Sequence, residues 1–370
     1  MSETPQTFEE WWVGSHYRKF VQQEGLPLYE ESYLENLATL PLAEWERRGG
    51  KAAYTRLGDQ EIVNLQVVEI PPKGELAPEK HMYESVMYVM SGTGATMIWQ
   101  EGEPRKTIEW AEGALLAIPL NAWHQEFNSS GDKPCRFFFG TSMAQAINQY
   151  HNFDFIFNNP FVFRDRYSYA MEDYHVKDRH WNLRLSETNF IPDIRKLTLD
   201  AWGEKGTRTS IMRLHMGNTD SQIHVLEVGE GTYVTAHRHG AGAHVIVIDG
   251  QGYELLFNPG DENNPARHRK VPIKPYGVVS PRLNEYHQHF NTGKGPFRQL
   301  AFKGWTASPA TSTSKGDYDP VGAARSNNPH GYAYKLRYDK EAPSVREEYY
   351  RELEKNGVDL RLEPIDQGAK

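Results

Sequence analysis

Residues 235–250, TAHRHGAGAHVIVIDG, join two closely spaced histidines to an apolar segment that ends in Asp-Gly. His237 and His239 are separated by a single residue. Side chains two positions apart on a β-strand point to the same face, so both imidazoles are expected to reach one point in space. Two ligands of one metal ion must do the same. The stretch therefore predicts a strand that carries part of a metal site.

A further pair of histidines follows in residues 281–291, PRLNEYHQHFN. His287 or His289, placed on a strand across a barrel, would bring a third imidazole to the first pair. A donor set rich in histidine and poor in carboxylate suits Fe, Mn, Zn, Cu or Ni. Open coordination positions at such a site would suit a metal that also takes a substrate and O2.

Two strand-rich segments, residues 52–142 and 206–304, share one plan. Each has a strand and a glycine turn, a histidine-bearing strand, a Gly-x-Gly turn, another strand, and a proline followed by His and Asn. Short strands between glycine turns are typical of a sandwich or barrel. The repeated plan indicates an internal duplication, and therefore two similar all-β domains.

The remaining segments predict the extensions of these domains. Residues 1–51 are expected to be mainly helical and to dock through their aromatic side chains. Residues 143–205 form an ordered, aromatic-rich connection that is too apolar for a flexible linker. Residues 305–370 hold a polar loop, 306–329, and then a helix over about 344–356, with Ser344 as its cap and Gly357 as its stop.

The composition excludes several classes of protein. The chain has 370 residues, a formal net charge of -8 and 38% hydrophobic residues. It contains no basic run, so a nucleic-acid partner is not expected. No apolar run reaches the length of a membrane span, and the acidic start lacks a signal-peptide core. The single cysteine, Cys135, excludes an intrachain disulfide. A cytoplasmic protein is expected.

The motifs resemble those of the bicupins, two-domain members of the cupin superfamily with double-stranded β-helix (jelly-roll) barrels. Gly231 is followed after five residues by His237-Arg238-His239, and His287 begins the later H-x3-N motif. The usual glutamate is missing, since its place falls on Ala243 or His244. The string H-R-H-x-A-x-A is similar to that of gentisate 1,2-dioxygenase and related ring-cleaving enzymes, which also lack the glutamate.

This resemblance implies a metal site and an activity. The ligands would be His237, His239 and His287, with His289 beside them as a supporting or proton-transferring residue. The metal would be Fe(II), with Mn(II), Ni(II) or Zn(II) as alternatives. The protein would be a non-haem, extradiol-type dioxygenase that uses O2 on a hydroxylated or aminated aromatic acid. A homo-oligomer, dimer or tetramer, is also implied.

Alternatives to this activity stay open. A bicupin can bind a small ligand without catalysis, or use a metal for isomerisation or decarboxylation. Arg213 and Arg282 are candidates for binding a substrate carboxylate, because a guanidinium can pair with it in a bidentate manner.

The first β-domain carries a weaker version of the motif. Glu79, His81 and His124 align with the metal-ligand positions of the second domain. The favoured interpretation is a degenerate site that no longer binds metal, and the alternative is a two-His-one-carboxylate set that binds Fe(II). His244 is interpreted as a core histidine with hydrogen-bond partners.

Overall fold

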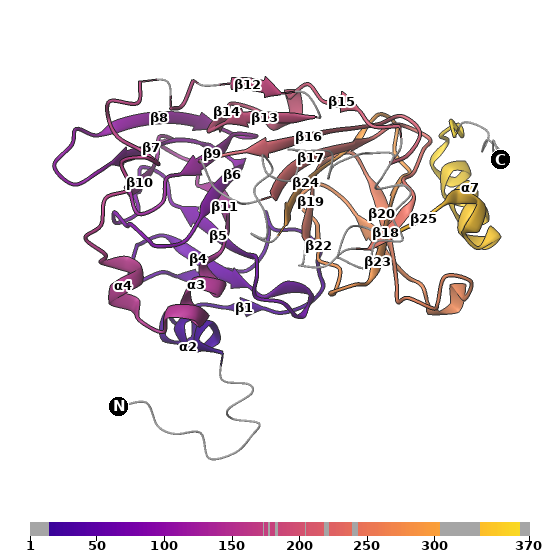
Figure 1. Ribbon diagram of the computed structural model, residues 1–370, viewed down its shortest axis with the longest axis horizontal. Helices are drawn as coiled ribbons and strands as arrows, with labels where there is room; N and C mark the ends of the chain where they lie inside the picture. Colours follow the sequence, from indigo (N-terminus) through magenta and orange to yellow (C-terminus); the bar gives the residue numbers. More distant parts are fainter. Residues whose placement is uncertain are drawn as a thin grey trace, which may run out of the picture. The chain divides into compact units, whose positions relative to one another are not determined.

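The structure is a computed structural model in which residues 15–172, 174–176, 178–181, 184–203, 205–217, 222–238, 243–303 and 334–362 are described (Figure 1). The predicted ligand His239 and the predicted polar loop 306–329 therefore lie outside the described residues. The chain divides into two compact units. Unit 1 comprises Met1–Glu30, Leu40–Arg56 and Glu61–Val176, and unit 2 comprises Glu31–Thr39, Leu57–Gln60 and Lys177–Lys370.

Unit 1 is built on two β-sheets. The larger has the strand order β1-β4-β5-β11-β6-β9, with β3 beside β4, and the smaller has the order β10-β7-β8. The strands are β1 (Leu28–Tyr29), β3 (Ala43–Glu44), β4 (Lys51–Thr55), β5 (Asn64–Ile70), β6 (Ser85–Ser91), β7 (Thr93–Trp99), β8 (Lys106–Ala111), β9 (Leu115–Ile118), β10 (Trp123–Asn128) and β11 (Cys135–Thr141). Burial alternates along β7 and β8, which therefore turn one face to the core.

Among the described residues of unit 1, three α-helices complete the unit: α2 (His16–Gln23), α3 (Met143–Tyr150) and α4 (Phe153–Phe157). Within the described part of the predicted helical extension, α2 is the one α-helix. Glu24 caps it, and Gly25 follows with a φ of 66°. Pro27 and Pro41 each lack a backbone N–H, so the chain continues as short strands rather than as helix.

Unit 2 repeats this architecture with more strands. Its larger sheet has the order β12-β13-β16-β17-β24-β19-β22-β2, with β15 beside β16, and its smaller sheet the order β21-β20-β23-β18-β25. The strands are β2 (Tyr33–Leu34), β12 (Asp178–Trp181), β13 (Leu185–Thr188), β14 (Phe190–Ile191), β15 (Asp200–Ala201), β16 (Thr209–His215), β17 (Gln222–Val228), β18 (Ala236–Arg238), β19 (Ala243–Asp249), β20 (Gly252–Phe257), β21 (Arg269–Ile273), β22 (Val278–Val279), β23 (Tyr286–Asn291), β24 (Phe297–Lys303) and β25 (Tyr334–Leu336). Short 3-10 turns lie at Leu57–Asp59, Ile194–Lys196, Pro265–Arg267 and Tyr338–Lys340.

The strand order of one unit is repeated in the other. The path β4-β5-β11-β6-β9 corresponds to β16-β17-β24-β19-β22, and β10-β7-β8 corresponds to β23-β20-β21. The bridge between Glu79 and His124 in unit 1 matches the pair His237 and His287 in unit 2. The preceding bridges, Glu75 to Phe127 and Tyr233 to Phe290, keep the same spacing. The duplication predicted from the sequence is therefore present in the register of the strands.

The Gly-x-Gly turns occupy places where only glycine fits. A Cβ on Gly94 would lie 2.2 Å from the carbonyl oxygen of Phe127, and one on Gly252 would lie 1.9 Å from that of Phe290. These glycines let β7 and β10, and β20 and β23, lie closer together than a side chain at this position would allow. The same physical requirement is met at the same place in both units.

The motif asparagines Asn128 and Asn291 hold loops rather than ligands. The Asn128 amide nitrogen donates to the carbonyl oxygens of Ile70, Pro71 and Lys133. The Asn291 amide nitrogen donates to those of Val228 and Gly295. Each side chain thereby links two backbone segments that are separate in the chain.

Helix α7 (Pro343–Asn356) packs on unit 2. It begins one residue before the predicted cap, Ser344, because Ala342 is the capping residue and Pro343 occupies the first turn, where its missing N–H costs nothing. Gly357 ends it in the left-handed conformation, as predicted. Its buried side chains join a cluster with residues of the smaller sheet: Val345, Tyr349, Leu353, Tyr233, Tyr253 and Phe290. Among the described residues, no helix is long and apolar enough to cross a membrane.

Candidate metal centres

Three histidines of unit 2 converge on one point. His237 lies on β18, and His287 and His289 lie on the neighbouring strand β23. One nitrogen of each ring lies within 4.8 Å of those of the other two, and all three residues are buried. The ring centroids of His237 and His287 are 4.1 Å apart. Together they form a nitrogen-only donor set of the kind that binds divalent transition metals.

His289 is held by a buried carboxyl group. Its Nδ1 lies 2.5 Å from Oε1 of Glu254, the residue opposite it on β20. The amide of Gln299 donates to the same oxygen at 2.9 Å. Histidines that bind metals commonly have their other ring nitrogen held in this way, which fixes the ring orientation. The Glu254 carboxyl group therefore orients the His289 ring.

Burial keeps these histidines neutral. It lowers the pKa of His289 well below its ordinary value, and the charges of Lys205 and Lys303 act in the same direction. Burial is also the main cause that lowers the pKa of His287 well below the ordinary range. Burial raises the pKa of the Glu254 carboxyl group well above its usual value. A neutral imidazole offers a lone pair, which is the form that a metal requires.

His239, the second predicted ligand, lies outside the described residues. Its equivalent in unit 1 is His81, because Glu79 matches His237 in register and each is followed two positions later by a histidine. By the same count, His289 is the equivalent of Glu126.

His244 is engaged away from this cluster. Its Nδ1 lies 2.9 Å from Oγ of Ser280 and 3.5 Å from the Gln60 amide nitrogen. The ring is fully buried and has polar neighbours, which is the usual situation of a core histidine.

The two predicted substrate arginines differ in their placement. Arg282 has a side chain that is 61% exposed and pairs with Asp59 at 2.7 Å, so it faces the surface of unit 2. Arg213 lies on β16 opposite His224, and its charge acts on Lys303.

Two lysines that the sequence analysis did not single out, the buried Lys205 and the half-buried Lys303, lie near the histidines. Lys205 is only 4% exposed, and burial lowers the pKa of its amine well below the ordinary value. Burial lowers the pKa of Lys303 to about 8. Lys303 lies an even number of residues after Gln299 on the same strand, so the two side chains point to the same face, and this spacing could have identified it from the sequence. Lys205 lies in a turn, where no sequence pattern marks it. Their amines make the surroundings of the histidines suitable for an anion.

Unit 1 brings Glu79, His81 and His124 together. Their candidate ligand atoms all lie within 4.8 Å of one another, and the three residues are buried. Nδ1 of His124 lies 2.6 Å from Oε1 of Glu126, and Nδ1 of His81 lies 2.8 Å from the carbonyl oxygen of Tyr83. When each Nδ1–H donates to these oxygens, each Nε2 keeps its lone pair. The buried Nε2 of His124 has no hydrogen-bond partner among the described residues. The three residues therefore fit a divalent metal such as Fe(II).

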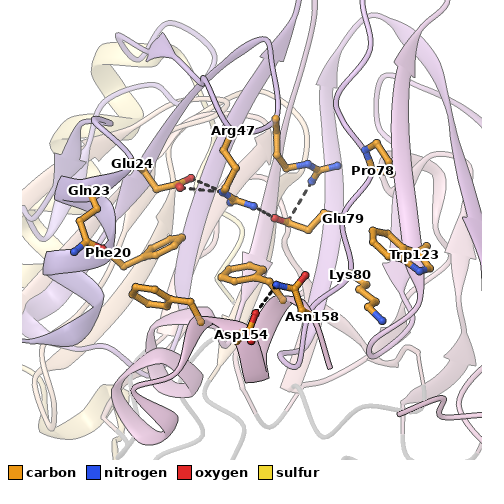
Figure 2. A pocket seen from close by; sticks show the side chains of 13 residues that line it. Phe20, Gln23, Glu24, Arg47, Pro78, Glu79, Lys80, Trp123, Asp154 and Asn158 are labelled. Carbon is orange, nitrogen blue, oxygen red and sulfur yellow. Dashed lines mark hydrogen bonds and ion pairs between the residues drawn. The ribbon is translucent and has the colours of Figure 1, made fainter. Parts of the chain in front are cut away.

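Two arginines hold the carboxylate of this set (Figure 2). Arg47 pairs with both Glu79 and Glu24, and Arg48 lies 3.4 Å from Glu79 and 2.9 Å from Glu126. Burial alone would raise the pKa of Glu79, but the two arginines outweigh it and hold the pKa at about 2. Glu79 is thus ionised at neutral pH. A carboxylate already paired with arginines also fits the degenerate site that the sequence analysis favours.

Comparison with known proteins finds distant likenesses among solved structures. No family profile and no curated protein sequence matches the chain. Solved structures do match: an oxalate decarboxylase variant from Bacillus subtilis has 12% sequence identity and a TM-score of 0.48 over 74% of this chain and 76% of that chain. Hazelnut (Corylus avellana) vicilin has 12% identity and a TM-score of 0.45 over 71% of this chain and 85% of that chain.

The fold consists of two related all-β barrels in one chain. The two repeated barrels with helical extensions confirm the fold class predicted from the sequence. Likenesses at this level carry no argument about activity or substrate, because one fold hosts many unrelated functions.

Proposed function

We propose that the protein is a metal-dependent enzyme whose metal is bound in unit 2 by His237, His239 and His287. The equivalence of the units supports this set, because Glu79, His81 and His124 occupy the matching positions in unit 1. His289 takes the place of Glu126, whose role in unit 1 is to hold the neighbouring histidine. In this assignment, His289 and Glu254 support the ligands and carry a proton between them.

We further propose that the reaction is the oxidation or ring cleavage of a hydroxylated or aminated aromatic acid by O2, with Fe(II) as the metal. The observation that carries this proposal is the buried, nitrogen-only cluster of unit 2. Bound Fe(II) would supply the reaction with O2, which protein side chains lack. Mn(II), Ni(II) and Zn(II) fit the same donors, so the metal content must be measured.

The surrounding residues suit an acidic substrate. The amines of Lys205 and Lys303 have lowered pKa values because they are buried, and a carboxylate bound beside them would favour their charged forms. Nδ1 of His289, held by Glu254, is a place where a proton can be kept during the reaction.

The test is anaerobic loading of the purified chain with Fe(II), followed by metal analysis and by O2 uptake with a panel of hydroxybenzoates and aminohydroxybenzoates. His287→Ala should lose one equivalent of metal and all O2 uptake. His244→Ala is the matched control, since it removes another buried histidine of unit 2 and should keep both. Stoichiometric metal in unit 2 of His237→Ala would show that the ligand assignment is wrong.

The competing functions separate in the same experiment. A non-catalytic binder of small ligands would retain none of these metals after loading. A metal-dependent isomerase or decarboxylase would bind metal but would convert an acid without consuming O2. Saturable binding of a metal together with substrate-dependent O2 uptake is the result that the proposal requires.

A further inference from the structure

Unit 1 contains a pocket that the proposed function does not use. It has a volume of about 430 Å³ and is lined by residues of α2, of the β3–β4 turn, of the segment before β6, of β10 and of α4. This volume is in the range that holds a small organic molecule. Glu79 lies on its wall, so the pocket reaches the acidic member of the unit 1 cluster (Figure 2).

One wall of the pocket is aromatic. The ring of Phe20 lies 5.3 Å from that of Phe153 and 5.8 Å from that of Phe157, measured between centroids. Phe153 is 39% exposed although it is a large apolar side chain. Apolar surface left open at a pocket is typical of a ligand site, because a bound ring would cover it.

Arg47 is the charged group that a ligand in this pocket can reach. Its guanidinium lies 4.9 Å from the ring centre of Phe157 and 5.3 Å from that of Trp45, and these faces hold it in place. The Arg47 side chain is 34% exposed, whereas that of Arg48 is 2% exposed and sealed against Glu126. Arg47 therefore faces the pocket, and Arg48 belongs to the interior.

Two of the three carboxylates on the wall are largely covered and already paired, whereas the third, Asp154, is exposed. The side chains of Glu24 and Glu79 are only 10% and 5% exposed and are both paired with Arg47. Asp154 accepts a hydrogen bond from the Asn158 amide at 2.8 Å. Lys80, by contrast, adds a second cation, with its ammonium 5.2 Å from the ring centre of Trp123. Arg47 and Lys80 are therefore the cations that an anionic ligand in the pocket can reach.

We propose that this pocket binds a small aromatic carboxylic acid, with its carboxylate on Arg47 and its ring against Phe20, Phe153 and Phe157. A guanidinium can bind the ligand carboxylate with two parallel hydrogen bonds while it keeps its contact with Glu24. The ligand then lies beside Glu79, in unit 1. This site is independent of the histidine cluster of unit 2 and of the reaction proposed there.

The test uses the full chain, freed of metal, and benzoate as the probe in isothermal titration calorimetry. Wild-type protein should bind benzoate saturably, and benzamide, which has the same shape without the charge, at least about tenfold more weakly. Arg47→Gln should weaken benzoate binding by at least about tenfold, the loss expected for a charge-assisted hydrogen bond. Phe157→Leu keeps the charge and should weaken binding by a smaller factor.

Two matched variants locate the site. Arg18→Gln removes another partly exposed arginine of unit 1, paired with Glu30, and should bind benzoate as the wild type does. Arg267→Gln, which removes an exposed arginine of unit 2, should also bind it unchanged. Failure of Lys205→Met to bind benzoate, with normal binding by Arg47→Gln, would overturn the proposal and assign the probe to unit 2.

Further outcomes also decide against the site: absence of saturable binding at millimolar benzoate, or equal binding of benzamide. Where Arg47→Gln does not fold, the wild-type chain is modified with phenylglyoxal and the modified arginines are mapped by mass spectrometry. Benzoate should protect Arg47 and leave Arg18 reactive. Equal modification of Arg47 with and without benzoate would refute the proposal.

Discussion

His289 and Glu254 face each other across the ladder between β23 and β20, with Nδ1 of the imidazole 2.5 Å from Oε1 of the carboxyl group. Unit 1 has a different pair at these positions: Glu126 takes the place of His289, and Thr96 takes the place of Glu254. In unit 1 the carboxyl group that contacts a histidine, Glu126, lies on the same strand, β10, as that histidine, His124. In unit 2 it stands on the neighbouring strand.

Glu254→Gln is expected to weaken metal binding in unit 2. The amide cannot exchange a proton with Nδ1 of His289 as a carboxyl group can, and its oxygen is a weaker acceptor than a carboxylate, so the ring would be held less firmly. Loss of a carboxylate that holds a metal-site histidine typically lowers metal affinity by about 10- to 100-fold. The measurement is a competitive titration of Mn(II) or Fe(II) against a chelator. Glu347→Gln, an exposed glutamate of α7, is the control. An unchanged affinity in Glu254→Gln would show that this pair does not act on the metal.

His81 should make the metal-free protein sensitive to acid. Burial, with the nearby His124, lowers the pKa of His81 to about 3 from its ordinary value of 6.5. Between these two values the unfolded chain binds a proton that the folded chain does not, so stability falls as the pH falls. For one proton, the free energy of unfolding changes by about 1.4 kcal/mol per pH unit. Glu79, with its pKa at about 2, adds to the loss at pH values below its ordinary 4.5.

Urea unfolding at a series of pH values, in the presence of EDTA, measures this dependence. His81→Gln should show a shallower fall in the free energy of unfolding between about pH 6.5 and pH 3 than the wild type. His180→Gln, which changes a histidine with a 53% exposed side chain, should follow the wild-type curve. Parallel curves for His81→Gln and the wild type would contradict the buried, neutral state of this ring.

Asn291→Ala is expected to destabilise the fold without removing a ligand. Its amide donates to two carbonyl groups, and both hydrogen bonds would be lost. Asn128→Ala should do the same in unit 1, where three carbonyl groups depend on the side chain. A buried polar group left without a partner costs about 1–3 kcal/mol. Denaturant unfolding measures the loss, with the exposed Asn258→Ala as the control. A loss of metal from a fully stable Asn291→Ala protein would instead indicate a role at the site.

Gly252→Ala should be among the most damaging alanine substitutions in unit 2. The new Cβ would lie 1.9 Å from the carbonyl oxygen of Phe290, and the two strands would have to move apart. Overpacking of this kind costs about 1–3 kcal/mol, and a contact with backbone belongs to the upper end. Gly203→Ala is the control, since its Cβ would meet nothing within 4 Å. Equal melting temperatures for the two variants would show that the strand approach is not as tight as described.

Much of the fold was accessible from sequence patterns because the requirements are local. A Gly-x-Gly turn, a histidine two positions from another and an asparagine after a histidine each have a physical reason within one strand or one turn. Repetition of the same set in residues 52–142 and 206–304 then predicted two related barrels. The helix α7 and its glycine stop follow from local signals as well.

The surroundings of the sites were less accessible, because burial and charge depend on residues that are distant in sequence. Arg282 was a candidate for substrate binding, but it lies at the surface with Asp59. The buried Lys205 and the half-buried Lys303 lie near the histidines instead. No sequence motif marks Arg47 as a binding residue. Its importance arises only where α2, α4 and the segment that holds Glu79 form one pocket.

The sequence by itself determined which residue types recur at which spacing, and so the two barrels and the histidines that define the candidate ligands. The tertiary structure decided which partners those residues have. Glu79 is ionised because two arginines from the β3–β4 turn outweigh its burial, and His289 is oriented because β20 places Glu254 opposite it. Spacing along a strand fixes the direction of a side chain, whereas its electrostatic environment is set by the strands and helices that pack around it.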